Sequence, residues 1–209
     1  TDGPGKEGIS CFVVEKGTRG RTVGREEDKM GQRASGTVAL FFEGCRVGAD
    51  ALVGERGRGD DIALSALGGG RVGIAALSLG LAEASLAQGL SYAGERQVFG
   101  QPLSSYQNTR FVLADCRTEL DAAWLLTLRA ARLLDRGDRA AAATSMAKLY
   151  ASEACGRVVD RVVQLHGGMG YSRESAVERL YRDARVTRIY EGTSEVQRLV
   201  IARGLLGSA

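Results

Sequence analysis

The sequence has few of the residues from which metal sites and disulfide frameworks are built. It contains a single histidine, His166, and four cysteines that lie far apart, with no C-x-x-C spacing. Metal sites and disulfide frameworks both depend on clustered or regularly spaced ligands, which are absent from this pattern. We therefore expect no metal, and we interpret the cysteines as buried thiols in a reducing compartment: Cys11, Cys45, Cys116 and Cys155.

A strong charge of one sign is also lacking. The net charge is +3 with 25% charged residues, and acidic residues are interleaved with the arginines of residues 173–203. Nucleic-acid and membrane-surface proteins concentrate basic residues on one face, so we expect neither partner. No uninterrupted apolar run of about 20 residues and no charged-then-apolar leader occur. We expect a soluble protein of the cytoplasm, or of the mitochondrial matrix if the source is eukaryotic.

The first part of the chain has the pattern of a β segment. Residues 8–15 and 37–43 are β-branched and aromatic, and the glycine-rich stretch between them is typical of turns with one more short strand. Two or three strands bury little, so we expect residues 1–58 to be part of a larger sheet whose other strands precede Thr1. A chain that opens on Thr1 is either a processed product or part of a longer polypeptide.

From residue 59 onward, alanine and leucine predominate and Pro102 is the only proline. Apolar residues recur at helical spacing in three long segments, and two shorter helices follow, capped by Ser172 and by Thr193 or Ser194. The sequence therefore predicts a mainly α fold, an antiparallel four-helix-type bundle over residues 59–209 preceded by a partial β-sheet segment. The three stripes are Val72, Ala75, Leu79, Ala82, Leu86, Leu90 and Ala93; Leu113, Cys116, Leu120, Trp124, Leu128 and Ala131; and Met146, Leu149, Val158, Val162 and Leu165.

Glu191 is the strongest candidate for chemistry. It lies in "RIYEGTSEVQR", between Tyr190 and Gly192, just before a predicted helix start. Apolar neighbours strengthen a carboxylate as a base by excluding water, and glycine lets a ligand approach the main chain closely. The alternative, an acid placed favourably at a helix N-terminus, is equally compatible with the local sequence.

Two further segments could bind an anion or a ring system. "QLHGGMGYS" is a glycine-rich turn that could present backbone N–H groups to a pyrophosphate, although a tight interhelical turn explains it equally well. His166 within it has no nucleophile or carboxylate partner in view and is typical of a packed residue. "GERQVFGQPLSSYQ" contains Arg96, suited to phosphate, and Phe99, suited to covering a heterocycle; a structural loop is the alternative.

Together these segments resemble the acyl-CoA dehydrogenase family, and the resemblance covers nearly the whole chain in order. The first 58 residues are similar to the second half of the family's middle β domain, and residues 59–209 to its C-terminal helical bundle. The motifs that carry the resemblance are "GISCFVVEKGT", "DKMGQRAS", "CRVGADALVGERGRG", "GGGRVGIAALSLGLAEASL", "YAGERQVFGQPLSSYQ", "AKLYASE", "QLHGGMGYS" and "ERLYRDARVTRIYEGTSEVQR".

The resemblance implies a mechanism and a set of site residues. Glu191 would remove the α-proton of an acyl-CoA thioester while hydride leaves the β-carbon for N5 of FAD, with the thioester carbonyl polarised by the Glu191 N–H and a flavin hydroxyl. Arg71 and Gly192 would lie on the substrate side. The implied FAD contacts are Arg96, Phe99, Gln107, Gln164, Leu165, His166, Gly167, Gly168, Thr193, Ser194 and Glu195.

Two positions differ among relatives. Some branched-chain and long-chain members carry the base where this chain has Gly70, so the resemblance leaves Glu191 without a rival. Short-chain members often carry an acid where this chain has Gly68, which would help to hold the acyl-CoA, so this position does not assign the chain length. The substrate that the resemblance implies is a short or medium straight chain, or a small branched one.

The resemblance also implies partners: an electron-transfer flavoprotein as electron acceptor, and a homodimer or a tetramer in which some residues reach the FAD of a neighbouring subunit. Because relatives have an N-terminal helical domain and further β strands, we expect the isolated chain to bind FAD weakly and to need the longer protein for activity. Two alternatives stay open: a non-catalytic assembly or partner subunit, and a flavin oxidase or acyl-CoA reductase on the same scaffold.

Overall fold

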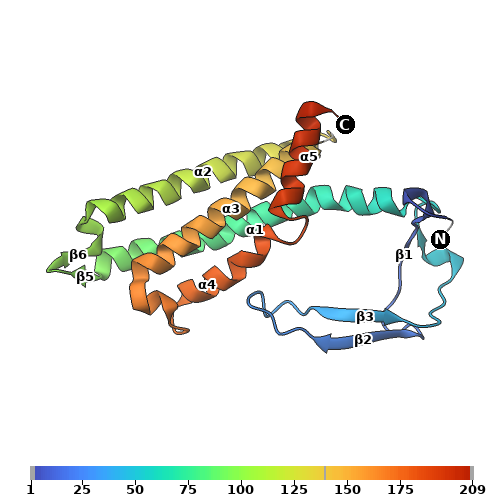
Figure 1. Cartoon of the computed structure of the whole chain (residues 1–209), viewed down its shortest axis with the longest axis horizontal. Coiled ribbons are helices and arrows are strands. Elements are labelled where there is room, and N and C mark those ends of the chain that lie inside the picture. The colour runs from blue at the N-terminus through green and yellow to red at the C-terminus, as the bar shows by residue number, and fades with distance from the viewer. Residues whose placement is uncertain (1–2, 139, 208–209) are drawn as a thin grey trace. The chain divides into compact units, whose positions relative to one another are not determined.

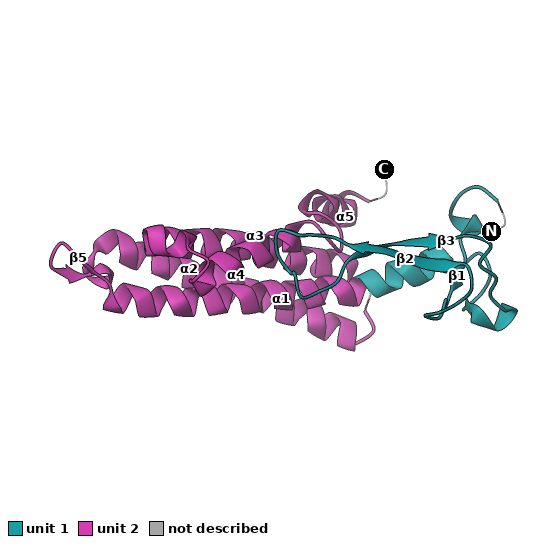
Figure 2. Ribbon diagram, turned by 90° about the horizontal axis from the view of Figure 1, so that it is seen from below, with its two compact units in different colours: residues 1–67 teal, residues 68–209 magenta. Residues whose placement is uncertain are grey.

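The computed structural model describes residues 3–138 and 140–207, and the chain divides into two compact units. The units are residues 1–67 and 68–209, which Figure 2 distinguishes by colour. The predicted boundary between residues 58 and 59 coincides with the start of a long helix, whereas the compact units divide inside that helix, between Leu67 and Gly68. The domain boundary therefore stays a prediction.

The first unit contains two antiparallel pairs of short strands. The strands expected within residues 8–15 and 37–43, and the further strand between them, are confirmed. A fourth strand, of two residues, was not predicted. The pairs are β1 (Cys11–Phe12) with β4 (Leu52–Val53) and β2 (Arg21–Glu26) with β3 (Val38–Phe42), and the register of the second pair is irregular between Val23 and Glu26.

The apolar side chains of β3 are largely exposed. Leu40, Phe41 and Phe42 keep 47%, 52% and 52% of their surface accessible. All five residues of the strand are exposed, so neither face is covered. A strand this apolar is typical of a sheet that is covered on both faces. That strands preceding Thr1 complete this sheet stays a prediction.

The second unit is an antiparallel helical bundle, so the predicted mainly α fold is confirmed. The long helices lie side by side in Figures 1 and 2, and the shorter α4 and α5 follow at the end of the chain. The first of the long helices has 37 residues, compared with 29 and 26 for the other two. The helices are α1 (Gly59–Glu95), which begins in the first unit, α2 (Gln107–Asp135), α3 (Ala141–His166), α4 (Ala176–Ala184) and α5 (Ser194–Leu206).

Small residues dominate the core of the bundle. The predicted stripes supply much of it, although Leu90 of the first stripe and Trp124 and Leu128 of the second are largely exposed. A Cβ at Gly89 of α1 would lie 3.1 Å from Val162 of α3, so these two helices approach closely. The buried apolar cluster consists of Ala75, Leu79, Ala82, Leu86, Cys116, Leu120, Ala123, Ala130, Ala147, Ala151, Cys155, Val158, Val159, Val162, Val177 and Ala184.

Two serine or threonine caps fix the starts of the short helices. Thr193 caps α5 as predicted, because its hydroxyl accepts a hydrogen bond from the Val196 N–H. The predicted cap at Ser172 was wrong. Ser175 caps α4 instead, accepting from the Val177 N–H, while Ser172 lies in the turn before it and accepts from the Glu174 N–H.

Helix α1 is long and apolar enough to cross a membrane by length and composition alone, with a mean hydropathy of 1.5 over its most apolar window. Glycine and serine residues divide this part of the sequence, so it contains no uninterrupted apolar run of about 20 residues. One face of the same helix, including Ala75, Leu79 and Ala82, is buried in the bundle core. The core helix of a soluble protein can have the same length and composition.

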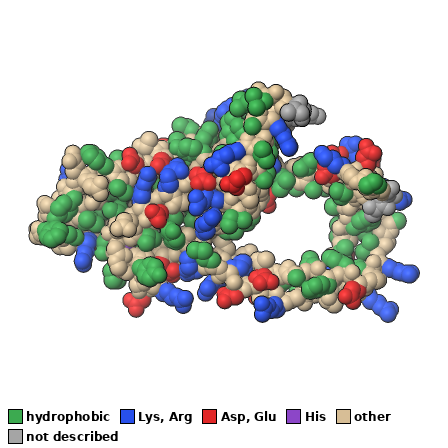
Figure 3. All heavy atoms as spheres, in the orientation of Figure 1, with side chains coloured by type: hydrophobic (Ala, Val, Ile, Leu, Met, Phe, Trp, Pro, Cys, Tyr) green, Lys and Arg blue, Asp and Glu red, His purple; other side chains and the backbone are tan. Residues whose placement is uncertain are grey.

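Charged side chains of both signs are interspersed on the face of the bundle shown in Figure 3. Several form ion pairs between helices: Arg117 of α2 contacts Glu83 of α1 at 2.7 Å, and Arg157 and Arg161 of α3 contact Glu119 of α2 at 2.9 and 3.0 Å. These pairs are partly exposed, so each contributes little to stability. They join neighbouring helices across the bundle surface.

The two serines before α4 provide a matched test of the cap. We expect Ser175→Ala to lower the free energy of unfolding by about 1 kcal/mol, because it removes the acceptor at the helix N-terminus. Ser172→Ala should have a smaller effect. Urea denaturation monitored by circular dichroism measures both, and a larger loss for Ser172→Ala than for Ser175→Ala would contradict this assignment.

Candidate active site

Glu191 lies in a tight turn between the short 3-10 helix η5 (Arg185–Arg188) and α5. Its φ is 53°, a left-handed conformation that is rare for a residue with a side chain, and Gly192 follows with a φ of 90°. Such a conformation persists only where the surroundings hold it, and it is often found at functional sites. The groups that hold this turn are therefore part of the candidate site.

Two buried side chains bind the carbonyl oxygens of the turn. Gln197 of α5 donates from Nε2 to the carbonyl oxygens of Glu191 and Gly192, at 3.0 and 2.9 Å. Lys148 of α3 donates from Nζ to the Gly192 carbonyl at 2.8 Å. Both donors are fully buried. The two consecutive carbonyls thus point into the bundle.

The Glu191 carboxylate lies over Gly70 of α1. A Cβ built at Gly70 would lie 2.5 Å from Glu191 Oε2 and 3.0 Å from its Cδ. The carboxylate therefore occupies space that any other residue at position 70 would fill. The hydrogen bonds that the described residues form with Glu191 use its carbonyl group.

Arg71, the next residue of α1, provides a positive charge beside this carboxylate. Its side chain is only 8% exposed, and among the described residues its Nε has no hydrogen-bond partner. Burial lowers the pKa of Arg71, while the negative charge of Glu191 opposes this shift. Burial, and then the charge of Glu191, raises the pKa of Tyr190. The turn thus brings the Glu191 carboxylate close to the buried guanidinium of Arg71, whose Nε–H has no acceptor among the described residues.

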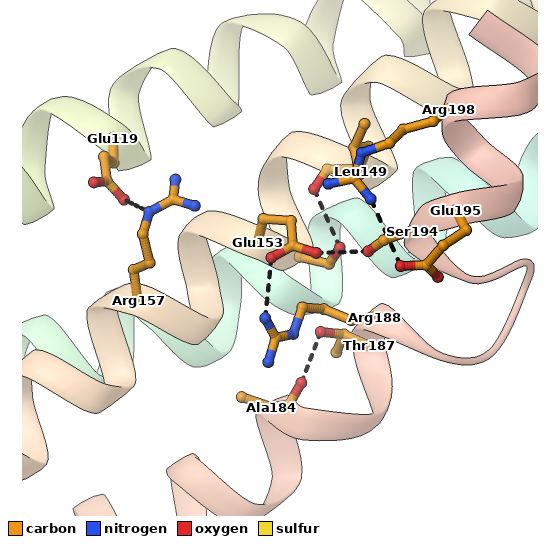
Figure 4. A network of polar contacts seen from close by, with 11 residues as sticks. Glu119, Leu149, Glu153, Arg157, Ala184, Thr187, Arg188, Ser194, Glu195 and Arg198 are labelled. Carbon is orange, nitrogen blue, oxygen red and sulfur yellow. Dashed lines mark hydrogen bonds and ion pairs between the residues drawn. The ribbon is translucent and has the colours of Figure 1, made fainter.

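A polar network behind the turn fixes the start of α5 (Figure 4). Glu153 of α3 accepts hydrogen bonds from the Ser194 hydroxyl at 2.6 Å and from Arg188 Nη1 at 3.0 Å. Burial alone raises the pKa of a carboxyl group, but these hydrogen bonds and the charge of Arg188 outweigh it and lower the pKa of Glu153. One carboxylate therefore joins the residues on both sides of the Glu191 turn.

His166 is a packed residue at the far end of α3. Its ring stacks on Tyr92 with centroids 4.1 Å apart, and its Nδ1 donates to the Val162 carbonyl at 2.8 Å. Gly167 ends the helix with a φ of 57°. No group of three or more histidine, cysteine, aspartate or glutamate residues that could hold a metal occurs in the described parts of the chain.

Phe99 projects from the tip of a small hairpin between α1 and α2, formed by β5 (Gln97–Val98) and β6 (Gln101–Pro102). The ring is 95% exposed, and Phe99 has a φ of 48°, followed by Gly100 at 82°. Tyr106 donates from its hydroxyl to the Val98 carbonyl at 2.6 Å and so supports the hairpin. A fully exposed ring on a strained, supported turn is suited to contact with a ligand.

The predicted site residues form two groups at opposite ends of the bundle. The hairpin and the turn after α3 lie together at one end, while the Glu191 turn lies beside α5 at the other (Figure 1). Along α3 the separation between Lys148 and His166 is about 27 Å. One group contains Arg96, Phe99, Gln107, Gln164, Leu165, His166, Gly167 and Gly168, and the other Arg71, Glu191, Gly192, Thr193, Ser194 and Glu195.

The hairpin group fits the FAD that the resemblance implies. It exposes the ring of Phe99, the guanidinium of Arg96 and the main chain of Gly167 and Gly168, which suit a flat ring system and an anionic phosphate. In the other group, Thr193 and Glu195 are accessible at the start of α5, whereas the Ser194 hydroxyl is buried and donates to Glu153.

Three side chains that contact the Glu191 turn or the start of α5 were not predicted from the sequence: Lys148, Glu153 and Gln197. All three are polar residues in helices, and local sequence does not indicate that they face the bundle interior. Lys148 and Glu153 are part of the quoted segment "AKLYASE", where two charged residues interrupt the apolar side of a helix. A charge on the buried stripe of a helix was the signal that could have found them.

A protein-family model described as "Acyl-CoA dehydrogenase, C-terminal domain" matches residues 57–206. Among curated proteins, the short-chain specific acyl-CoA dehydrogenase of rat mitochondria is 51% identical over 202 residues, which cover 97% of this chain and 49% of the relative. The chain thus spans about half the length of that relative.

Two solved structures superpose closely on the chain. Butyryl-CoA dehydrogenase from Megasphaera elsdenii matches with a TM-score of 0.95 and 44% identity, over 97% of this chain and 53% of that one. A chain from the structure of the electron transferring flavoprotein of Acidaminococcus fermentans matches with a TM-score of 0.96 and 43% identity, over 98% and 54%.

The network around Glu153 predicts a pH dependence of stability. Because the pKa of Glu153 is lowered on folding, its contribution is present above the ordinary value of 4.5 and is lost as the pH falls through the lower, folded value. We expect Glu153→Gln to lower the free energy of unfolding by about 1 to 2 kcal/mol at pH 7, with a smaller difference below about pH 4.5. Urea denaturation over this pH range measures it, and a difference independent of pH would contradict the assignment.

Proposed function

The chain belongs to the acyl-CoA dehydrogenase family, and from this premise we propose that it carries the catalytic base of an FAD-dependent enzyme that oxidises an acyl-CoA between its α and β carbons. Because the chain spans about half the length of its relatives, the proposal concerns the whole protein. The observation that carries it is the position of Glu191, whose carboxylate lies over Gly70 while its own carbonyl is held inside the bundle.

In this reaction Glu191 accepts the α-proton of the thioester. The α-carbon becomes acidic enough only when the thioester carbonyl is polarised, and the main-chain N–H of Glu191 is the donor that this chain offers. Gly192 allows the thioester to approach the main chain, and we place the buried guanidinium of Arg71 on the substrate side of the site. FAD, when bound, would supply the acceptor for the hydride that leaves the β-carbon.

We assign the binding of FAD to both groups of residues, which no single copy of the bundle brings together. One FAD molecule would be held by the turn after α3 and by Arg96, Phe99 and Gln107. Another part of that FAD, or the FAD of another subunit, would be contacted by Thr193 and Glu195. Their separation by about 27 Å along α3 supports an oligomer in which sites are shared between subunits. We therefore propose a homodimer or a tetramer.

The substrate we propose is a short-chain acyl-CoA. Both the rat and the Megasphaera relatives have names that specify short acyl groups, and their identities to this chain are 51% and 44%. Medium-length and small branched chains remain within the range implied by the sequence. The likeness to a chain in an electron transferring flavoprotein structure supports such a flavoprotein as the electron acceptor. The compartment stays a prediction, either the cytoplasm or, as named for the rat relative, the mitochondrion.

Glu191→Gln tests the base assignment. We expect the longest available form of the protein to show flavin absorbance that acyl-CoA bleaches in the absence of oxygen, and the variant to keep the flavin. Its bleaching rate should fall by about 10²- to 10⁴-fold, because an amide cannot accept the proton. Stopped-flow absorbance with a panel of acyl-CoAs of increasing length measures the rate and the chain-length preference.

Glu174→Gln is the matched control, since Glu174 is an exposed acid in the turn before α4. Its bleaching rate should equal that of the unchanged protein. Unchanged bleaching by Glu191→Gln would remove the base assignment. A protein without flavin and without bleaching would favour the non-catalytic subunit instead.

Gly70→Ala tests the position of the carboxylate. A methyl group there would displace the Glu191 carboxylate, so we expect the bleaching rate to fall by about 10-fold or more. Stability should rise by about 0.5 to 1 kcal/mol, because alanine favours a helix more than glycine does. Gly69→Ala, where a Cβ would meet nothing within 4 Å, should raise stability without slowing the reaction. Equal rates for the two variants would contradict the proposed geometry.

A further inference from the structure

Lys148 is the largest fully buried side chain of the protein's described residues. It extends from α3 to the Glu191 turn, where its Nζ donates to the Gly192 carbonyl at 2.8 Å. An amine in such a place has lost most of its hydration, and burial lowers its pKa. Replacement of a buried charge by an apolar side chain of similar size is often neutral or stabilising, so Lys148 does not fit the role of a stabilising core residue.

Gln197 is equally buried and reaches the same turn from α5. Its Nε2 donates to two consecutive carbonyl oxygens, while its Oε1 has no partner among the described residues. The reverse orientation of the amide would place Oε1 against both carbonyl oxygens, which repel it. Gln197 therefore provides donors for the carbonyl oxygens of the turn, while its own Oε1 is left without a donor among the described residues.

The two donors together fix the direction of the Glu191–Gly192 peptide. The Gly192 carbonyl accepts from both Lys148 and Gln197, which uses both of its lone pairs. Close approach at this point requires glycine, since a Cβ at Gly192 would lie 2.6 Å from Gln197 Nε2. With both carbonyls held inward and Glu191 at a φ of 53°, the Glu191 side chain is directed to Gly70.

We propose that Lys148 and Gln197 are positioning residues for the base: by holding the carbonyls of Glu191 and Gly192 inside the bundle, they keep the strained turn that places the Glu191 carboxylate over Gly70. This rests on the proposed function of Glu191. Without the two donors, the turn relaxes to a conformation more favourable for a residue with a side chain, and the carboxylate moves away from its place.

Two methionine substitutions test this. Lys148→Met and Gln197→Met keep an unbranched side chain of similar length but remove the donor. In hydrogen exchange of the longest available form of the protein, we expect peptides that cover residues 187–199 to exchange about 10-fold faster in either variant. Peptides from α2 should be unchanged. This readout does not depend on activity.

The kinetics give the second readout. We expect the kcat for acyl-CoA oxidation to fall by about 10- to 100-fold in each variant, because a displaced base slows proton removal. KM should change by less than about threefold, and the flavin content should be retained. The two losses should be less than multiplicative in the double variant, since both donors act on one carbonyl. Thr127→Val, which removes a buried hydroxyl that donates to Ala123 within α2, should leave kcat unchanged.

Several results would overturn the inference. Wild-type kcat in both methionine variants would show that the turn does not need these donors. A loss of kcat that is matched by lost flavin would show a merely structural role. Unchanged exchange in residues 187–199 would show that the two donors do not hold the turn. If Lys148→Met does not fold, Gln197→Met carries the same two readouts. Glu191→Gln separates the two claims: if it still oxidises acyl-CoA, the proposed function fails, whereas the exchange result still decides whether the donors hold the turn.

Discussion

The conformation of the Glu191–Gly192 peptide is the constraint on which the candidate site depends. A residue with a side chain is held at a positive φ, and the hydrogen bonds that hold it come from two buried donors, Lys148 and Gln197. Left-handed backbone costs free energy at any residue other than glycine, and a buried amine costs more. Other contacts around the turn offset these two unfavourable free energies. Glu153 of α3 binds Ser194 at the start of α5 and Arg188 before the turn.

The small residues of the bundle serve the same geometry. Alanine and glycine along the core let the helices approach closely, so that a side chain of α3 can reach the turn before α5. Gly70 leaves space on α1 for a carboxylate, and Gly192 leaves space for the amide of Gln197. The bundle therefore acts as a rigid frame that fixes one carboxylate beside one buried guanidinium, that of Arg71.

Much of the fold could be predicted from the sequence, because apolar residues at helical spacing over a long segment predict a helix that buries this side against other helices. The Thr193 cap and the strands around residues 11 and 40 were predicted from local patterns, and Ser175 was missed because Ser172, three residues earlier, fits the same pattern. Glu191 was predicted as a candidate base from its neighbours Tyr190 and Gly192 and from the resemblance. The charge of Lys148 on the apolar side of a helix was a signal that it is buried, but the contact that Lys148 and Gln197 make could not be predicted, since it depends on which face of a helix meets a distant turn. A lysine or a glutamine in a helix is otherwise typical of the surface.

The most direct test is a crystal structure of the longest available form of the protein with FAD and an acyl-CoA analogue that has no β-hydrogens and so cannot react to completion. The account predicts a Glu191 carboxylate oxygen within about 3.5 Å of the α-carbon, with the Glu191 and Gly192 carbonyls still bound to Gln197 and Lys148. A carboxylate turned to solvent, or a different acid beside the α-carbon, would contradict it.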